Sequence, residues 1–489
     1  MPAPGVYEEG ALDPFVDNDP IGRGVQPGIL YATDRKRAAP DDEDHAYYTY
    51  RRARKLQLGL ARVRLGQDDA ITWDEARRIS LLKNRPEEYP LEVTGIEELG
   101  ALEQTVPPAD DQTLRSPEPG RRFIEEVNER LAASAKKDVY IYVHGYKVNF
   151  ENPILVAAEL WHFLGYNGAF IAYSWPTKFS MWAYFADLDN AVNSARYLRT
   201  LVIDLARKSD AERIHIIGYS AGTRLVSRML ADLGMYAYLM DEEEIDRTVK
   251  LGNVILIGSD VDQDILAGYL LDGGLRVADS LTLYVSEADS ALRFSRRMFR
   301  GRERAGELLD RTPLNPRAKA FMDGHPELRI IDVTEAEGGT GGSGHSYFRS
   351  SPWVSSDLLM TLLYDLTPAE RGLVKEEDFP IWGFPPNYVE RLRTSLARIS
   401  TRPPRMPRGP IGCSSRVSHG CSNSAHSGPV SVRTGVFRPS IRHLDCAREP
   451  NGLPPGQSDQ AGGGPDGPQI LANCRSAGLL EAAGPEGTL

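Results

Sequence analysis

The chain has 489 residues, of which 41% are hydrophobic and 26% charged, and its formal net charge is −11. This composition is that of an ordinary globular protein, and it excludes a wholly disordered chain and a fibrous repeat. The negative charge argues against nucleic acid or an anionic membrane as a general partner. No apolar run approaches the roughly 20 residues that a transmembrane helix needs, so we expect no transmembrane segment.

Both ends of the chain differ from its middle. The first twenty residues lack the basic and apolar stretches of a signal peptide, so we expect a cytoplasmic protein, or an exported one if translation starts upstream. We expect residues 1–27 to form a flexible N-terminal arm. Residues 401–489 contain 14 glycines and 12 prolines, which predicts a low-complexity, disordered tail. All four cysteines lie after residue 412, at a spacing that fits no zinc site, so we expect neither a disulfide framework in the core nor a metal.

Between these ends, apolar runs typical of strands alternate with helical patterns. The predicted strands are 29–34, 56–65, 138–146, 169–175, 213–222, 253–260, 280–289 and 328–334. The predicted helices are 121–137, 153–164, 184–207, 223–233, 262–271, 291–299 and 357–366. This alternation predicts an α/β domain over residues 28–400, with a mostly parallel central sheet, helices on both faces and a core at about 121–366. Residues 67–120 are polar and rich in proline, and we assign no elements there.

One motif indicates chemistry, and it lies between a predicted strand and a predicted helix: Gly218-Tyr219-Ser220-Ala221-Gly222. This is the context of a nucleophile elbow, a strained turn that exposes a serine at the carboxyl end of a sheet. Gly218 and Gly222 leave room where the two backbones approach closely. The helix N-terminus directs free N–H groups at the same place. We therefore predict that Ser220 is a nucleophile, with a structural turn serine as the alternative.

A nucleophilic serine needs a general base, which this architecture places after the serine and the acid in the chain. Before the tail, only His325 and His345 follow Ser220. His345 comes after the last predicted strand, on a glycine-rich loop that can reach over the serine. His325 precedes that strand and belongs to the opposite end of the sheet. We predict that His345 is the base and that His325 is a turn histidine.

The acid that orients the base should follow a strand between the serine and the histidine. Asp289, four residues after the run LTLYV, is the predicted acid. Asp260 and Asp262 follow the preceding strand and are its rivals. Their alternative role is to cap the helix that begins there.

Acyl transfer also needs N–H donors for the oxyanion hole. One predicted donor is the backbone N–H of Ala221. The other comes from the loop His144-Gly145-Tyr146, where we expect the N–H of Tyr146, with Gly145 or Lys147 as alternatives. We expect the His144 side chain to brace this loop.

Aromatic side chains gather between residues 175 and 185, among them Trp175, Trp182 and Tyr184. They predict an acyl pocket or lid, with ordinary packing as the alternative. Residues 339–344 fit the pattern G-x-G-x-x-G, but no helical sequence follows directly, so we expect no dinucleotide and no other cofactor.

Six segments together resemble a bacterial α/β-hydrolase family of unknown function: YIYVHGYKVNF, AFIAYSWP, YFADLDNA, IIGYSAGTRL, YVSEADSAL and GHSYF. The resemblance covers about residues 28–366, and YATDRKR is similar to the opening strand of that family. It implies an α/β-hydrolase fold, esterase-like activity and a catalytic triad at Ser220, Asp289 and His345.

We therefore expect a serine esterase that cleaves a small-molecule or lipid-like ester, or a related acyl bond, through an acyl-enzyme. A peptidase or thioesterase would use the same triad. A catalytically silent interaction module would keep the fold, and it predicts a Ser220 that is buried or out of hydrogen-bond reach of His345. The sequence predicts no oligomeric state.

Overall fold

The computed structural model describes residues 3–10, 12–15, 28–66, 72–81, 89–102, 118–178, 184–307, 316–336, 338, 344–376 and 379–399. Contacts divide the chain into two units, residues 1–412 and 413–489. Every described residue belongs to the first unit. The predicted disordered tail, 401–489, lies outside the described residues.

The described residues form an 11-stranded sheet with the order β10-β11-β9-β8-β7-β6-β4-β5-β1-β2-β3. Its parallel strands are β1 (Gly28–Arg37), β4 (Asp138–Val143), β5 (Ala169–Ser174), β6 (Arg213–Tyr219), β7 (Leu251–Ile257), β8 (Ala278–Val285), β9 (Leu328–Asp332) and β11 (Ile381–Gly383). The antiparallel strands β2 (Tyr48–Leu65) and β3 (Leu91–Ala101) form one edge, and β10 (Val374–Lys375) forms the other. The predicted mostly parallel α/β sheet is confirmed.

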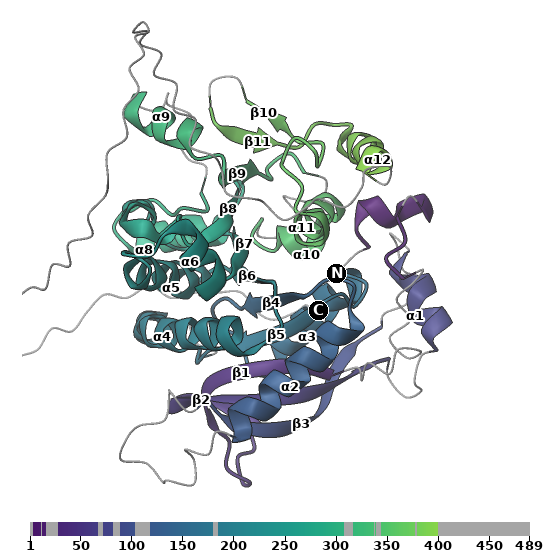
Figure 1. Ribbon diagram of the computed structural model, residues 1–489, viewed down its shortest axis with the longest axis vertical. Coiled ribbons are helices and arrows are strands. Elements are labelled where there is room, and N and C mark those ends of the chain that lie inside the picture. Colours follow the sequence, from purple (N-terminus) through teal and green to yellow (C-terminus); the bar gives the residue numbers. More distant parts are fainter. Residues whose placement is uncertain are drawn as a thin grey trace, which may run out of the picture. The chain divides into compact units, whose positions relative to one another are not determined.

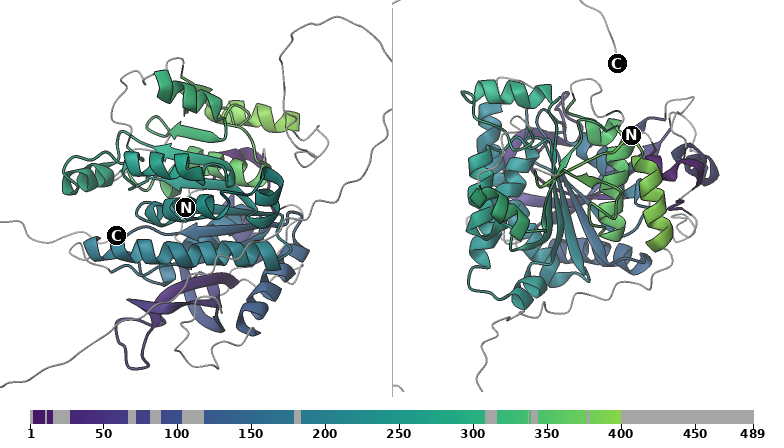
Figure 2. Two further views of the ribbon diagram at one scale, coloured as in Figure 1. Left: turned by 60° about the vertical axis from the view of Figure 1, so that its left-hand side comes forward. Right: turned by 90° about the horizontal axis from the view of Figure 1, so that it is seen from above.

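Helices cover both faces of this sheet, as Figures 1 and 2 show. One face holds α2 (Glu118–Ala133), α4 (Tyr184–Lys208) and α5 (Gly222–Tyr236), and the other holds α3 (Glu151–Phe163), α11 (Pro352–Tyr364) and α12 (Tyr388–Ile399). The remaining helices are α1 (Trp73–Ser80), α6 (Glu242–Thr248), α7 (Gln263–Tyr269), η5 (Leu270–Gly274), α8 (Ser290–Met298), α9 (Pro316–Gly324) and α10 (Tyr347–Ser350). None of the described helices combines the length and the apolar character needed to cross a membrane.

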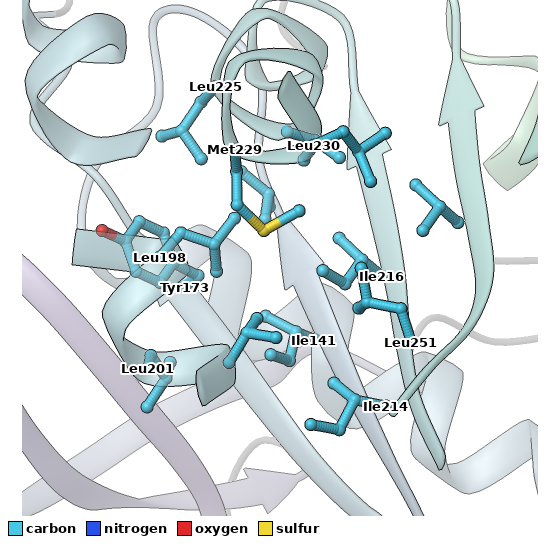
Figure 3. Packing of buried hydrophobic residues seen from close by; sticks show 14 of the residues in the cluster. Ile141, Tyr173, Leu198, Leu201, Ile214, Ile216, Leu225, Met229, Leu230 and Leu251 are labelled. Carbon is cyan, nitrogen blue, oxygen red and sulfur yellow. The ribbon is translucent and has the colours of Figure 1, made fainter. Parts of the chain in front are cut away.

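The two helix layers explain why the central strands are apolar throughout. In β4 the side chains of Val139, Ile141 and Val143 join the core on the α4 and α5 side. Tyr140 and Tyr142 alternate with them and join the core on the α3 and α11 side. Figure 3 shows Ile141 with side chains of α4 and α5 packed over it. Since both faces of the strands are buried, their apolar runs are nearly continuous.

The N-terminal residues differ from the predicted flexible arm. A short 3-10 helix, η1 (Gly5–Gly10), packs against the domain. Val6 and Tyr7 are fully buried, the backbone N–H of Val6 donates to the Ser356 hydroxyl, and the Tyr7 hydroxyl donates to the carbonyl of Phe163. The apolar pair at 6–7 is too short to give a periodic signal, which is why the sequence did not indicate this contact. Residues 16–27 lie outside the described residues.

Candidate functional site

Parallel strands bring the predicted site residues to one edge of the sheet. Ser220 follows β6, Asp289 follows β8, and His345 lies in the connection after β9. Neighbouring parallel strands end at the same edge, so these three residues, far apart in the chain, meet there.

Ser220 occupies a strained turn between β6 and α5. Its φ is +52°, in the left-handed region that side chains other than glycine rarely adopt. The turn is held because the Ser220 N–H donates to the carbonyl of Ile257 at 2.8 Å, and the Thr223 N–H donates to the Ser220 carbonyl at 3.0 Å. Ser220 itself is half-buried rather than buried.

Glycines around Ser220 permit a very close approach of three backbones. A Cβ on Gly222 would lie 2.3 Å from the carbonyl oxygen of His144, and one on Gly145 would lie 2.9 Å from the Cβ of Ser220. A Cβ on Gly218 would lie 3.0 Å from a methyl carbon of Val226. The start of α5 and the loop after β4 therefore both press against Ser220.

Asp289 and His345 form a tight pair. His345 Nδ1 lies 2.6 Å from Asp289 Oδ2, and the side chains are 11% and 0% exposed. The other carboxylate oxygen of Asp289 accepts the Leu292 N–H at 3.0 Å and so caps α8. With Nδ1 donating to Asp289, the Nε2 of His345 is an acceptor that has no hydrogen-bond partner among the described residues.

Ser220 and His345 both contact the end of β7, at Ile257 and Gly258, which brings them close together. No hydrogen bond joins them in the described part of the chain. The Ser220 N–H bonds to Ile257, and the next residue, Gly258, contacts the His345 ring. A Cβ on Gly258 would lie 3.0 Å from His345 Cε1. Hydrogen bonds between a nucleophile and its base are often long without substrate and tighten in the complex, so this geometry is compatible with a base role for His345.

Two residues near His345 were missed by the sequence reasoning. Gly258 has a φ of +53° and lies directly against the imidazole. The fully buried hydroxyl of Tyr347 accepts the Gly258 N–H at 2.7 Å and donates to the Tyr284 carbonyl at 3.0 Å. Tyr347 thus ties the segment after His345 to β7 and β8. A glycine within the predicted strand 253–260 was the one available signal.

The rival acids and histidine are engaged elsewhere. Asp260 pairs with Arg224 at 3.1 Å and accepts a hydrogen bond from the Ser295 hydroxyl. Asp262 caps α7 through the N–H groups of Asp264 and Ile265. His325 precedes β9, and its Nδ1 lies 2.7 Å from the Phe321 carbonyl, at the end of the strand opposite His345.

Of the predicted oxyanion donors, the Ala221 N–H lies at the start of α5 and has no hydrogen-bond partner among the described residues. In the second loop, Lys147 adopts a positive φ of 62° directly after Tyr146. The hydrogen bonds do not select between the N–H groups of Gly145, Tyr146 and Lys147, so the second donor stays a prediction.

The buried His144 side chain contacts the backbone of this loop. It is fully buried, and its Nδ1 lies 2.7 Å from the Gly145 carbonyl. Burial, and then the charge of Arg35, hold the pKa of His144 well below its usual value, so the ring is neutral.

Trp175 is not exposed as a lid would be. It is 1% exposed, its indole N–H donates to the His144 carbonyl at 2.7 Å, and its ring stacks on that of His144 at 5.5 Å. The packing alternative therefore holds for Trp175. Trp182 lies outside the described residues, as does the side chain of Tyr184 at the start of α4.

The part of the chain that the structure describes contains no group of three or more side chains placed to hold a metal ion. A protein-family model described as "alpha/beta hydrolase of unknown function (DUF900)" matches residues 121–362. No match was found among curated proteins or among solved structures. The matched residues contain the turn of Ser220, the acid Asp289 and the loop of His345.

Proposed function

Because the chain belongs, through residues 121–362, to a family of α/β hydrolases of unknown function, we propose that it is a serine hydrolase that cleaves carboxylic esters or related acyl bonds. The observation that carries the proposal is the 2.6 Å hydrogen bond between His345 and Asp289, next to the strained turn of Ser220. A turn serine without a chemical role would need neither the strain nor an oriented imidazole beside it.

In the proposed reaction, Ser220 Oγ attacks the substrate carbonyl while His345 Nε2 takes its proton. The resulting oxyanion accepts hydrogen bonds from the Ala221 N–H and from the loop after β4, where Tyr146 is the favoured donor. His345 then gives its proton to the leaving alcohol, which leaves an acyl group on Ser220. Water, deprotonated by His345, releases the acid and restores the serine.

Asp289 acts on the tautomer of His345. Its carboxylate accepts a hydrogen bond from Nδ1–H, which keeps the ring proton on Nδ1 and leaves Nε2 free to accept the proton of Ser220. It also stabilises the imidazolium that forms during the attack. The buried position of Asp289 strengthens both effects, because little water screens the pair.

A fluorophosphonate probe, which reacts with activated serines, tests this proposal. We expect the wild type to be labelled, Ser220→Ala to lose labelling, and His345→Ala to be labelled far more slowly. His325→Ala is the matched control, since it removes a histidine at the opposite end of β9, and should be labelled like the wild type. A folded wild type that neither reacts with the probe nor hydrolyses any acyl substrate would overturn the proposal.

A second candidate function is the catalytically silent interaction module, favoured by the lack of a hydrogen bond between Ser220 and His345 in the described residues.

A substrate panel distinguishes the remaining candidates. p-Nitrophenyl esters of increasing chain length, matched thioesters and peptide amides separate an esterase from a thioesterase or peptidase. We expect the esters to give the largest kcat/KM; turnover of none of the three classes would favour the silent module.

A further inference from the structure

Arg35, near the carboxyl end of β1, is a buried cation without a counterion. Its side chain is 1% exposed. Within the described residues, no carboxylate lies within ion-pair distance of its guanidinium. The equally buried Arg371, by contrast, pairs with Asp357 at 2.6 Å. Burying an unpaired charge costs folding free energy. A buried, unpaired arginine beside a candidate site therefore suggests a functional role.

The hydrogen-bond partners of Arg35 are neutral, and they belong to the loop after β4, to the last residue of β5 and to the turn after it. Its Nη2 donates to the Val148 carbonyl at 2.8 Å and lies 3.3 Å from the Thr177 hydroxyl. Its Nε donates to the Ser174 hydroxyl at 3.0 Å. The Thr177 hydroxyl also bonds to Val148, donating to its carbonyl at 2.8 Å. Arg35 therefore fixes one end of the segment 144–148, whose other end is held by Trp175.

This segment is the one that presses on Ser220. A Cβ on Gly145 would lie 2.9 Å from the Ser220 Cβ, so a small shift of the loop changes the space in front of the serine. Arg35 also meets His144, with Nη2 at 3.5 Å from Nε2. The charged groups around it are Asp34, Glu151 and Asp187, which act on it through space. Burial lowers the pKa of Arg35 to about 10, so it remains a cation at neutral pH.

We propose that Arg35 is a positioning residue of the oxyanion hole, which holds the 144–148 loop in place and supplies a buried positive charge beneath the oxygen that becomes negative during attack by Ser220. Arg35 acts through the loop and does not touch the substrate. The inference rests on the proposed serine-hydrolase function. A fixed charge in a buried site stabilises a developing anion more than it would in water.

The test compares Arg35→Lys and Arg35→Met with Arg371→Lys, the same change at an equally buried arginine, which pairs with Asp357 of α11. For each variant we would measure kcat and KM on a p-nitrophenyl ester, the melting temperature, and the inhibition constant of a trifluoromethyl ketone, which forms a tetrahedral adduct with an activated serine. We expect Arg35→Lys to lower kcat by about tenfold and Arg35→Met by about a hundredfold, with KM changed by less than about threefold.

We further expect ketone inhibition to weaken in parallel with kcat/KM across the Arg35 variants. Arg371→Lys should lower the melting temperature without changing kcat. A purely structural Arg35 would behave like Arg371, and that result would overturn the inference while the proposed function stands. A wild type that shows neither labelling by the fluorophosphonate nor turnover would overturn both. If Arg35→Met does not fold, the kinetics of Arg35→Lys test the inference. Lysine keeps the positive charge but lacks the planar set of guanidinium N–H donors that holds the loop.

Discussion

At the scale of single residues, Gly258 sets where the imidazole of His345 lies. We predict that Gly258→Ala lowers kcat/KM by about a hundredfold, because the new Cβ would lie 3.0 Å from His345 Cε1 and 3.2 Å from Nδ1. The ring must then move, which disturbs its hydrogen bond to Asp289. Steady-state kinetics on an ester substrate, together with a thermal melt, measure this effect.

Gly301→Ala is the matched control for that variant. Gly301 also has a positive φ, +83°, but a Cβ there meets nothing within 4 Å. Both substitutions carry the backbone penalty of about 1–2 kcal/mol for a left-handed alanine. Gly301→Ala should lose stability and keep its activity. If Gly258→Ala also kept wild-type kcat/KM, the contact would not position the ring.

Some site residues can be recognised from the sequence around them, whereas the role of others depends on partners that are far away in the chain. Ser220, Asp289 and His345 were recognisable as candidates because each follows its own strand and their order in the chain matches the architecture. Gly258, Tyr347 and Arg35 were not. Tyr347 is 89 residues from the N–H that it accepts, and Arg35 is 113 residues from the carbonyl that it binds. Such roles exist only after the strands have aligned.

At the scale of elements, Asp289 joins helix α8 to the His345 loop. We predict that Asp289→Asn keeps the cap of α8, since an amide oxygen also accepts the Leu292 N–H. The amide NH₂ would then face His345 Nδ1 and place the ring proton on Nε2, the wrong tautomer for a base. We expect kcat/KM to fall by about 10³–10⁴-fold with little change in the free energy of unfolding. Kinetics and urea unfolding measure the two effects separately.

Asp262→Asn serves as its control, because Asp262 caps α7 without contacting a histidine in the described residues. That variant should retain both activity and stability. Asp289→Ala removes cap and acceptor together and should also lose about 1 kcal/mol of stability. An Asp289→Asn protein with wild-type activity would reduce Asp289 to a helix cap.

Elements were predictable where burial on both faces makes a strand apolar throughout, as in β4 to β8. The outermost strands, β3 and β10, were not predicted. In β3, LEVTGIEELGA, exposed and charged positions interrupt the buried ones. The sequence therefore lacks the continuous apolar run that marks a buried strand. The early strands β1 and β2 were expected, but the N-terminal contact of Tyr7 with α3 was not. A short apolar segment gives no period to detect, and its partner lies far along the chain.

At the scale of the whole molecule, every described residue of the candidate site belongs to the first unit. The described contacts named above that position Ser220, Asp289 and His345 come from residues between 35 and 347, and the family match ends at residue 362. We predict that a chain ending after Ile399 keeps kcat/KM within about twofold of the full chain, since none of the contacts named above uses a residue beyond 347. Steady-state kinetics of the two chains, at equal protein concentration and on the same ester substrate, measure this ratio. A large loss would show that residues 400–489 take part in the reaction.

The stability of the whole domain should depend on pH through Asp34, which lies beside Arg35. Burial raises the pKa of Asp34 from 3.8 to about 7, against the opposing hydrogen bond from Ser194. Between pH 4 and 7 the folded chain therefore holds a proton that the unfolded chain has lost. Folding is then favoured at the acidic end of this window, and the stability falls as pH rises through it and levels off above about pH 7.

Asp34→Asn should remove this loss, because the amide is neutral at every pH. We predict that the variant gains more unfolding free energy relative to wild type at pH 8 than at pH 5, as measured by urea unfolding. Glu75→Gln is the control: Arg78 lowers the pKa of this exposed carboxyl, so it is ionised at both pH values and its removal should have the same effect at each. An equal effect of Asp34→Asn at pH 5 and 8 would mean that Asp34 is ionised in the folded protein at both pH values, and would contradict this prediction.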